Sequence, residues 1–463
     1  MKPLRKQGII IFSILALVLA ACGGDTTEET TVEETTQEVV ETLDSPAVTT
    51  ASSVETGVGV TSDPCPEAIG GIPTGADQSK GCIYLGMLND YTGPYAAAGP
   101  ALETAQRAFW LWANSSGGVG DYSVAIVEGT DTGYNPQKHL EAYNAQKGDV
   151  AALAMSLGTV QTLFILDEMD KDNMIGAPMS WYSGWSYKSV DKGLIVEFGS
   201  AYCADGMNAV DWALANLPVD IKTIGIMGGA GDYGSDWAAG VKYAAEKNGL
   251  TVAWEYTPPS TEFDVAQAVG LMVTQPVDAY FPAVVPSQMA QVAGGAAQQG
   301  VTPIAMLAAP AFNDAFVQEG FALKGLFESG AIYTMAWVAP FEYQSNAHAT
   351  MRATFASMGI DSASSFLVAG WSSQYHLKGV LEAAIKGGDL TRAGIRRAAA
   401  NVYVESDGMM LTRELGQDRA DKESFINIPD GSIASGVRML ASNYVGPSAE
   451  SYDFTQGPCF ASG

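Results

Sequence analysis

The chain has 463 residues, with 24 Lys and Arg against 51 Asp and Glu, and a formal net charge of −27 at pH 7. Proteins that bind nucleic acid need a basic surface to neutralise phosphates, so this balance argues against nucleic acid as a partner. Hydrophobic residues make up 47% of the chain. That fraction excludes a disordered protein, and at this length it predicts two or more domains with sizeable cores.

The N-terminus has the pattern of an export signal. Lys2, Arg5 and Lys6 precede an uncharged apolar run of 13 residues from Ile9 to Ala21. A permanent membrane span needs about 20 apolar residues, so this run is too short for one. The run ends in Leu-Ala-Ala-Cys at Cys22, which resembles the lipobox of bacterial lipoproteins. We therefore expect residues 1–22 to be a signal peptide ending at a lipidated Cys22, which anchors the exported protein to the outer face of the cytoplasmic membrane.

Residues 23–63 contain ten acidic residues and no Lys or Arg. A segment with little apolar surface and a single sign of charge cannot offset the entropy lost on ordering, and its self-repulsion keeps it extended. We expect it to be a disordered acidic tether between the anchor and the folded part.

Four cysteines remain after Cys22, namely Cys65, Cys82, Cys203 and Cys459. An even number in an exported protein favours disulfides, and four cysteines allow three pairings. Because Cys65 and Cys82 flank a loop rich in Pro and Gly, we favour that pair, which leaves Cys203 with Cys459 at the C-terminus. No CxxC or HExxH spacing occurs and the three His lie far apart, so the sequence predicts no metal site.

From Cys82 onward, short apolar runs alternate with segments of helical periodicity. The runs are rich in Val, Ile, Leu, Met and Ala, which is typical of parallel strands buried on both faces. The expected strands are 83–88, 122–127, 150–157, 174–179, 194–198, 222–227, 250–255, 277–281 and 303–308. The expected helices are 101–113, 136–146, 162–172, 205–216, 235–248, 287–299, 343–358 and 365–386. This alternation predicts right-handed βαβ units and a doubly wound α/β fold.

The first expected helix has a clear apolar stripe. Leu102, Ala105, Phe109 and Trp112 follow one another at spacings of three and four residues, which places them on one face. Trp110 lies off this stripe, so we expect it to be exposed.

Ligands of open α/β sheets bind beyond the carboxyl ends of the strands, so the loops that leave the strands are the candidate sites. Four such loops stand out: 89–100, 157–162, 178–185 and 228–234. In the last, Gly229, Gly231 and Gly234 fit GxGxxG after an expected strand, and Glu255 follows about 20 residues on. Taken alone, this motif fits a dinucleotide site in an exported oxidoreductase.

Several local patterns occur together in a fixed order. Thr92-Gly93-Pro94 follows the first strand, Thr130-Asp131-Thr132 precedes Asn135-Pro136, Asp232-Tyr233-Gly234 opens a helix, and Val277 to Phe281 leads to Ser287-Gln288-Met289. This order, from about Ile83 to Tyr444, resembles the type I periplasmic binding proteins of the leucine, isoleucine and valine binding kind, which serve ABC importers.

The resemblance implies two doubly wound, Rossmann-like lobes joined by three hinge crossings, with a ligand held between them. Lobe 1 would hold residues 64–201 plus 333–402, and lobe 2 residues 202–332 plus 403–463. The protein would capture a small molecule without catalysis or a cofactor, act as a monomer, and deliver its ligand to a membrane permease and ATPase. A ligand-sensing receptor domain would use the same fold, and the sequence does not separate the two roles.

The resemblance also implies ligand-binding positions. Gly158 and Thr159 would offer main-chain N–H groups and a hydroxyl to a carboxylate or amide oxygen. Tyr233 would reach across the cleft from lobe 2. The remaining positions implied in the strand-exit loops are Tyr95, Ser180, Trp181, Tyr182 and Ser183, with Trp181 and Tyr182 as apolar walls.

Two positions depart from the amino-acid-binding relatives. The Tyr and the acidic residue that hold the ammonium group there fall on Val285 or Pro286 and on Ala309. A buried ammonium group without an acidic partner is costly. We therefore expect a neutral or anionic ligand with an apolar or aromatic body, such as an amide or an aromatic carboxylate, rather than an ordinary amino acid.

Overall fold

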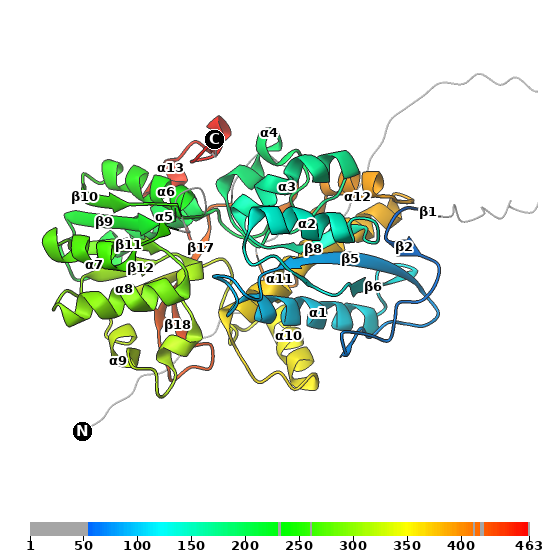
Figure 1. The fold of residues 1–463 in the computed structure, drawn as a ribbon, viewed down its shortest axis with the longest axis horizontal. Helices are drawn as coiled ribbons and strands as arrows, with labels where there is room; N and C mark the ends of the chain where they lie inside the picture. The colour runs from blue at the N-terminus through cyan, green and yellow to red at the C-terminus, as the bar shows by residue number, and fades with distance from the viewer. Residues whose placement is uncertain (1–53, 230–232, 260–261, 411–412, 417–420, 462–463) are drawn as a thin grey trace, which may run out of the picture. The chain divides into compact units, whose positions relative to one another are not determined.

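The computed structural model describes residues 54–229, 233–259, 262–410, 413–416 and 421–461, all within one unit, Ser52–Gly463 (Figure 1). The expected signal peptide, Cys22 and tether residues 23–53 lie outside the described residues. No helix in the described ranges is long and apolar enough to cross a membrane.

The first sheet is built around β5, and it defines lobe 1. In the described part of the chain its strands are β2 (Val60–Thr61), β5 (Gly81–Asn89), β6 (Tyr122–Ile126), β7 (Thr130–Asp131) and β8 (Ala152–Ser156). β6, β7 and β8 run parallel to β5, whereas β2 pairs with it antiparallel. Every residue of β8 is buried, as expected of a strand covered on both faces.

The second sheet defines lobe 2. Its order among the described residues is β10 (Thr251–Tyr256), β9 (Thr223–Gly228), β11 (Ala279–Ala283), β12 (Ile304–Leu307), β13 (Ile332–Ala336), β17 (Ser424–Pro429) and β18 (Val437–Tyr444). The first five strands are parallel to one another. β17 pairs antiparallel with β13, and β18 pairs antiparallel with β17. Three small pairs complete the strands: β1 (Glu55–Thr56) with β14 (Asp389–Leu390), β3 (Ala68–Ile69) with β4 (Ile72–Pro73), and β15 (Tyr403–Val404) with β16 (Arg413–Glu414).

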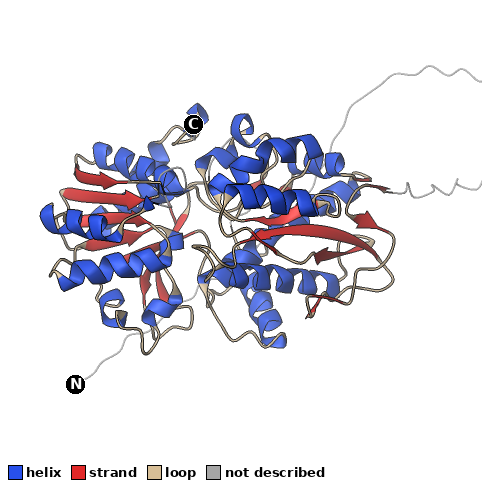
Figure 2. Cartoon of the chain, viewed as in Figure 1, coloured by secondary structure: helices blue, strands red, loops and turns tan. Residues whose placement is uncertain are grey.

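Helices flank the strands of both lobes (Figure 2). Those of lobe 1 are α1 (Gly99–Ser115), α2 (Pro136–Gln146), α3 (Thr159–Asp172), α4 (Lys188–Asp191), α10 (Asn346–Ser357), α11 (Ser365–Lys386) and α12 (Arg392–Ala399). Those of lobe 2 are α5 (Tyr202–Asn216), α6 (Tyr233–Lys247), α7 (Val265–Thr274), α8 (Pro286–Gln298), α9 (Lys324–Phe327) and α13 (Pro447–Ser451). The chain therefore crosses between lobes three times: before α5, after β13 and before β17. This is the predicted two-lobed, doubly wound fold.

Several local expectations were wrong. Residues 54–63 belong to the fold rather than to the tether, because β2 pairs with β5 at Val60 and Ile83. Residues 174–179 and 194–198 were expected to be strands but form isolated bridges instead. Gly176 pairs with Leu153 of β8 and with Ile195. β13 stays in the lobe 2 sheet to Ala336, beyond the expected boundary at residue 332.

Trp110 was also predicted incorrectly. It is 2% exposed, and its indole Nε1 donates to Gln374 Oε1 of α11 at 2.8 Å. α1 packs along α11. α11 therefore covers a second face of α1, and the apolar stripe of α1 does not predict the burial of that face.

Both predicted disulfides are present, Cys65–Cys82 and Cys203–Cys459. The second joins the start of α5 to the C-terminal tail, 256 residues away in the sequence. The tail is thus held against the body of lobe 2.

Candidate functional site

A small cavity lies between the lobes, beyond the carboxyl ends of β5 and β8. We call it the proximal cavity, and its lining residues come from loops and helix starts of both lobes. They include Tyr95, Tyr134, Gly158, Ser180, Trp181, Tyr202, Pro310, Trp337 and Phe366. Its volume is about 30 Å³, room for about two water molecules. A larger ligand therefore requires that the lobes or their side chains move apart.

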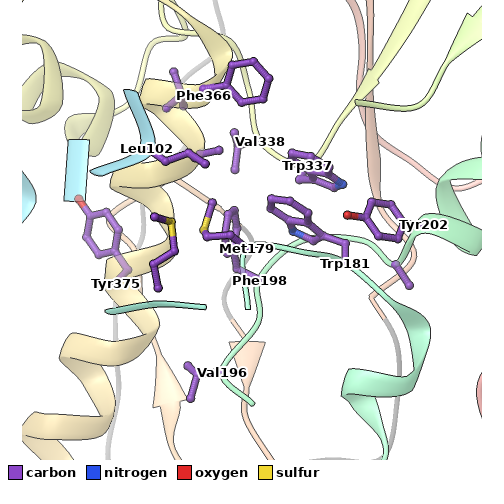
Figure 3. Close-up of a cluster of buried hydrophobic side chains, with 14 of the residues drawn as sticks. Leu102, Met179, Trp181, Val196, Phe198, Tyr202, Trp337, Val338, Phe366 and Tyr375 are labelled. Carbon is purple, nitrogen blue, oxygen red and sulfur yellow. The ribbon is translucent and has the colours of Figure 1, made fainter. Parts of the chain in front are cut away.

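Two stacked indoles form one wall of this cavity. Trp181 and Trp337 lie face to face, with ring centroids 3.3 Å apart and planes at 7°. Tyr202 packs edge-on against both rings. Figure 3 shows the indole pair with Met179 and Leu102 alongside it and Val338 and Phe366 beyond it. Trp181 comes from lobe 1 and Trp337 from the second crossing, so the stack joins the two sides of the cleft.

The N-terminus of α3 faces the cavity through Gly158. This residue has φ of +107°, where side chains are strained. A Cβ at this position would lie 2.6 Å from Cε2 of Tyr134 and would also contact Gln161 Oε1. Only glycine fits here, and it lets a ligand approach the first N–H groups of α3, which have no partner within the helix.

Two buried side-chain donors have no hydrogen-bond partner, one at the start of α3 and one in the stacked indole wall. They are Thr159 Oγ1 and Trp181 Nε1, on side chains 2% and 4% exposed. Thr159 opens α3 and does not cap it, because the N-cap position is Gly158. Buried polar groups are nearly always hydrogen-bonded. Thr159 Oγ1 and the α3 N–H groups are therefore suited to a carboxylate or amide oxygen from a ligand.

No Asp, Glu, Lys, Arg or His lines the proximal cavity among the described residues. Val285 is one of the positions where the family's amino-acid binders carry an ammonium-binding residue. It is the N-cap residue of α8 and does not line this cavity, and its N–H donates to Gln288 Oε1. Ala309 lines a second, neighbouring cavity instead. The described lining therefore contains no carboxylate that could pair with a ligand's ammonium group.

A sequence profile of the periplasmic binding protein family matches residues 82–424, well over half of the chain. This chain belongs to the periplasmic binding protein family. The match includes strands of both sheets and all the residues that line the proximal cavity. It also accounts for the loop 228–234 without a dinucleotide. Ala230–Asp232 of that loop lie outside the described residues, and Glu255 pairs with Lys242 on the surface, at 3.0 Å.

Solved structures of binding proteins share this fold. A fatty acid ABC transporter substrate-binding protein from Thermomonospora curvata is 25% identical, covering 86% of this chain and 97% of its own, with a TM-score of 0.75. A branched chain amino acid ABC transporter protein from Thermus thermophilus with bound valine is 12% identical, covering 80% and 98%, with a TM-score of 0.67. A solute binding protein from Rhodopseudomonas palustris BisB5 in complex with 3,4-dihydroxybenzoic acid is 15% identical, covering 79% and 99%, with a TM-score of 0.65. No curated protein matched by sequence.

Tyr182 and Ser183 of this binding protein have structural contacts rather than places in the lining. The Tyr182 hydroxyl donates to the carbonyl of Phe460 at 2.6 Å. Ser183 donates to Asp236 through both its N–H, at 3.0 Å, and its hydroxyl, at 2.6 Å. Cys459 N–H donates to the Ser183 hydroxyl oxygen. Ser180 and Trp181 belong to the same loop. These bonds attach that loop to α6 and to the C-terminal tail.

Tyr233 is 4% exposed and packs on Tyr202, with ring centroids 5.1 Å apart. It therefore lies behind the cavity wall rather than in it. Ser180 does line the cavity, and its hydroxyl accepts from Trp185 Nε1 at 2.9 Å. Tyr95 also lines it and packs on Tyr134.

Most of the lining residues were not predicted as site residues, including the aromatic residues Tyr134, Tyr202, Trp337 and Phe366. Trp337 directly follows β13, a strand that the apolar runs did not reveal. The family resemblance places a crossing between the lobes near this point. An aromatic residue at that crossing was the sequence signal that could have identified Trp337 as a site residue.

Proposed function

We propose that this protein is a lipid-anchored solute-binding protein of an ABC importer, and that its ligand is a carboxylate with an apolar body. The observation that carries the ligand class is the charge-free proximal cavity beside the start of α3, where the Thr159 hydroxyl is buried without a hydrogen-bond partner. A carboxylate there gains charge-assisted hydrogen bonds and a favourable helix dipole. An amino acid would also bury an ammonium group with no acid to pair with it.

The relatives' ligands are consistent with this chemistry. One relative belongs to a fatty acid transporter and another holds 3,4-dihydroxybenzoic acid, and both of these ligand types are carboxylates without an ammonium group. A third relative holds valine, which the lining found here does not favour. The ligand contacts we propose are Gly158, Thr159, Ser180, Trp181 and Tyr95. The protein itself performs no chemistry, and the permease and ATPase of the importer receive the ligand when the lobes open.

Thr159→Val tests the proposed carboxylate site. The change keeps the side-chain shape and removes the hydroxyl, so we expect Kd for benzoate-type and fatty carboxylates to rise about 10-fold. Thr159→Ser should stay within about threefold of the original protein. Titration calorimetry of the purified full-length protein with 3,4-dihydroxybenzoate, octanoate, valine and leucine measures both effects. Tight binding of valine or leucine, with no response to either carboxylate, contradicts the proposed ligand class.

Cys22→Ser tests the proposed anchor. A thiol at position 22 is needed for lipidation, so the variant should lose incorporation of labelled fatty acid and leave the membrane fraction. Cell fractionation and metabolic labelling with palmitate measure the two effects. The change touches none of the described fold, so ligand affinity should stay the same. A variant that remains membrane-bound and labelled to the original extent shows that Cys22 is not the anchor.

A further inference from the structure

A second cavity adjoins the proximal one, and we call it the distal cavity. Its lining comes from β13, β17 and β18, from the crossing after β13, and from the start of α11. Ala309, Phe312, Thr334, Val338, Phe341, Asn427 and Val437 are among its residues. Its volume is about 40 Å³, and no charged side chain lines it among the described residues.

The two cavities share three lining residues, Trp337, Phe366 and Ala369. These shared residues line both spaces, and both aromatic side chains can turn about their χ1 and χ2 bonds when the lobes open. In Figure 3, Trp337 lies against Trp181, and Val338 and Phe366 lie above this pair. A ligand that begins at the α3 helix start and passes these side chains therefore enters the distal cavity.

Two side-chain polar atoms of the distal cavity lining have no hydrogen-bond partner, Asn427 Oδ1 and Trp337 Nε1. Asn427 of β17 is 2% exposed, and its Oδ1 has no hydrogen-bond partner. Two other polar side chains of the lining are paired, because Thr334 donates to the carbonyl of Met335 at 3.1 Å and Ser435 donates to Glu342 at 2.7 Å. A buried amide without partners is costly, and such exceptions in native proteins call for an explanation.

We propose that Asn427 is a second polar contact for the ligand, and that the ligand is elongated, with a carboxylate at one end and a hydroxyl group at the other. This proposal rests on the proposed function, since the carboxylate end is placed at Gly158 and Thr159. The apolar body of the ligand lies against Trp181, Trp337 and Phe366. A hydroxyl group both donates and accepts, so it satisfies Asn427 in either orientation of the amide.

The proposal predicts length-dependent selectivity. A short hydroxy carboxylate cannot reach Asn427 from the α3 helix start, whereas one of matching length gains a buried hydrogen bond there. A ligand of that length without the hydroxyl leaves the amide unpaired. Sites built to bind a ligand hydroxyl discriminate against the analogue that lacks it.

Matched ligand pairs test this. Each member of a series of unbranched carboxylates is compared with its ω-hydroxy form by titration calorimetry on the full-length protein. We expect the hydroxyl to lower Kd about tenfold in the longer pairs and to have no effect in the shortest. Asn427→Leu, which keeps the branched side-chain shape and removes the amide, should abolish this tenfold preference while binding the plain carboxylates as tightly as before or more tightly. Ser435→Ala, in the same cavity, is the matched control and should keep the preference.

The outcomes separate the two proposals. Thr159→Val weakens both members of every pair equally if the carboxylate site is correct, whatever Asn427 does. If Asn427→Leu weakens both members equally, or leaves the hydroxyl preference intact, or if the original protein shows no preference at any length, then Asn427 is not a ligand contact. In that case water molecules fill the distal cavity.

Discussion

Asp236→Ala is expected to lower the free energy of unfolding by about 3–5 kcal/mol, the largest loss expected of a single substitution in this protein. Asp236 lies in the first turn of α6 and is completely buried. It accepts hydrogen bonds from the Ser183 N–H, the Ser183 hydroxyl and the Cys203 N–H, at 3.0, 2.6 and 3.2 Å. Alanine leaves all three donors buried without their acceptor.

The same substitution should also weaken ligand binding. Ser183 continues the loop that places Ser180 and Trp181 in the proximal cavity. Asp236 joins this loop of lobe 1 to the starts of α5 and α6 in lobe 2. Without it the loop loses two of its bonds across the lobes, so Kd should rise even at temperatures where the variant remains folded.

Urea unfolding followed by Trp fluorescence measures the stability effect, with Glu255→Ala as the matched control. Glu255 is a carboxylate of the same lobe whose pairing with Lys242 is exposed. Surface pairs of this kind contribute about 0–1 kcal/mol. A stability loss in Asp236→Ala no larger than that of Glu255→Ala would contradict the role given to Asp236.

The sequence predicted the bounds of a helix well where residues at the start of that helix favour helix initiation. α2 runs over Pro136–Gln146 as expected, because Asn135 caps it by accepting from Lys138 N–H at 3.0 Å and Pro136 occupies its first turn. α11 likewise runs over Ser365–Lys386, and Ser364 caps it. Such signals lie within a few residues of the helix and need no tertiary contact.

The elements that escaped prediction depend on partners far away in the sequence. β17 is a strand because β13 and β18 pair with it, and Trp110 is buried because α11 lies beside α1. For the site, the resemblance led to Gly158, Thr159 and Trp181. The stack of Trp337 on Trp181 and the place of Asn427 arise only when the two lobes come together.

A buried carboxyl group also lies where the three crossings meet. Asp205, in the first turn of α5, accepts hydrogen bonds from Ser200, before the helix, and from Ser424 at the start of β17. Burial raises the pKa of Asp205 from its usual 3.8 to about 7, although hydrogen bonds from Ser200 and Ser424 act in the opposite direction. The native state therefore keeps a proton on Asp205 that the unfolded chain has released, and stability is lost as the pH rises from about 4 through 7.

Buried histidines change stability in the opposite direction. Burial lowers the pKa of His139 from 6.5 to about 3. Between these values the unfolded chain binds a proton that the native state does not, so this contribution to stability rises with pH. Burial lowers the pKa of His348 to about 4 and raises that of Asp236 to about 7. The two carboxyl groups and the two histidines therefore offset one another.

Substituting one of the carboxyl groups or one of the histidines should reveal the two opposite dependences of the free energy of unfolding on pH. Asp205→Asn removes a carboxyl group, so the free energy of unfolding of this variant should increase with pH between about 4.5 and 6.5, by roughly 1 kcal/mol per pH unit relative to the original protein. His139→Asn should change the slope by a similar amount in the opposite direction. Urea unfolding at several pH values measures both, and because only slopes are compared, a constant loss of stability in either variant does not affect the result. Slopes of the same sign in the two variants would show that one of these groups does not titrate as its burial requires.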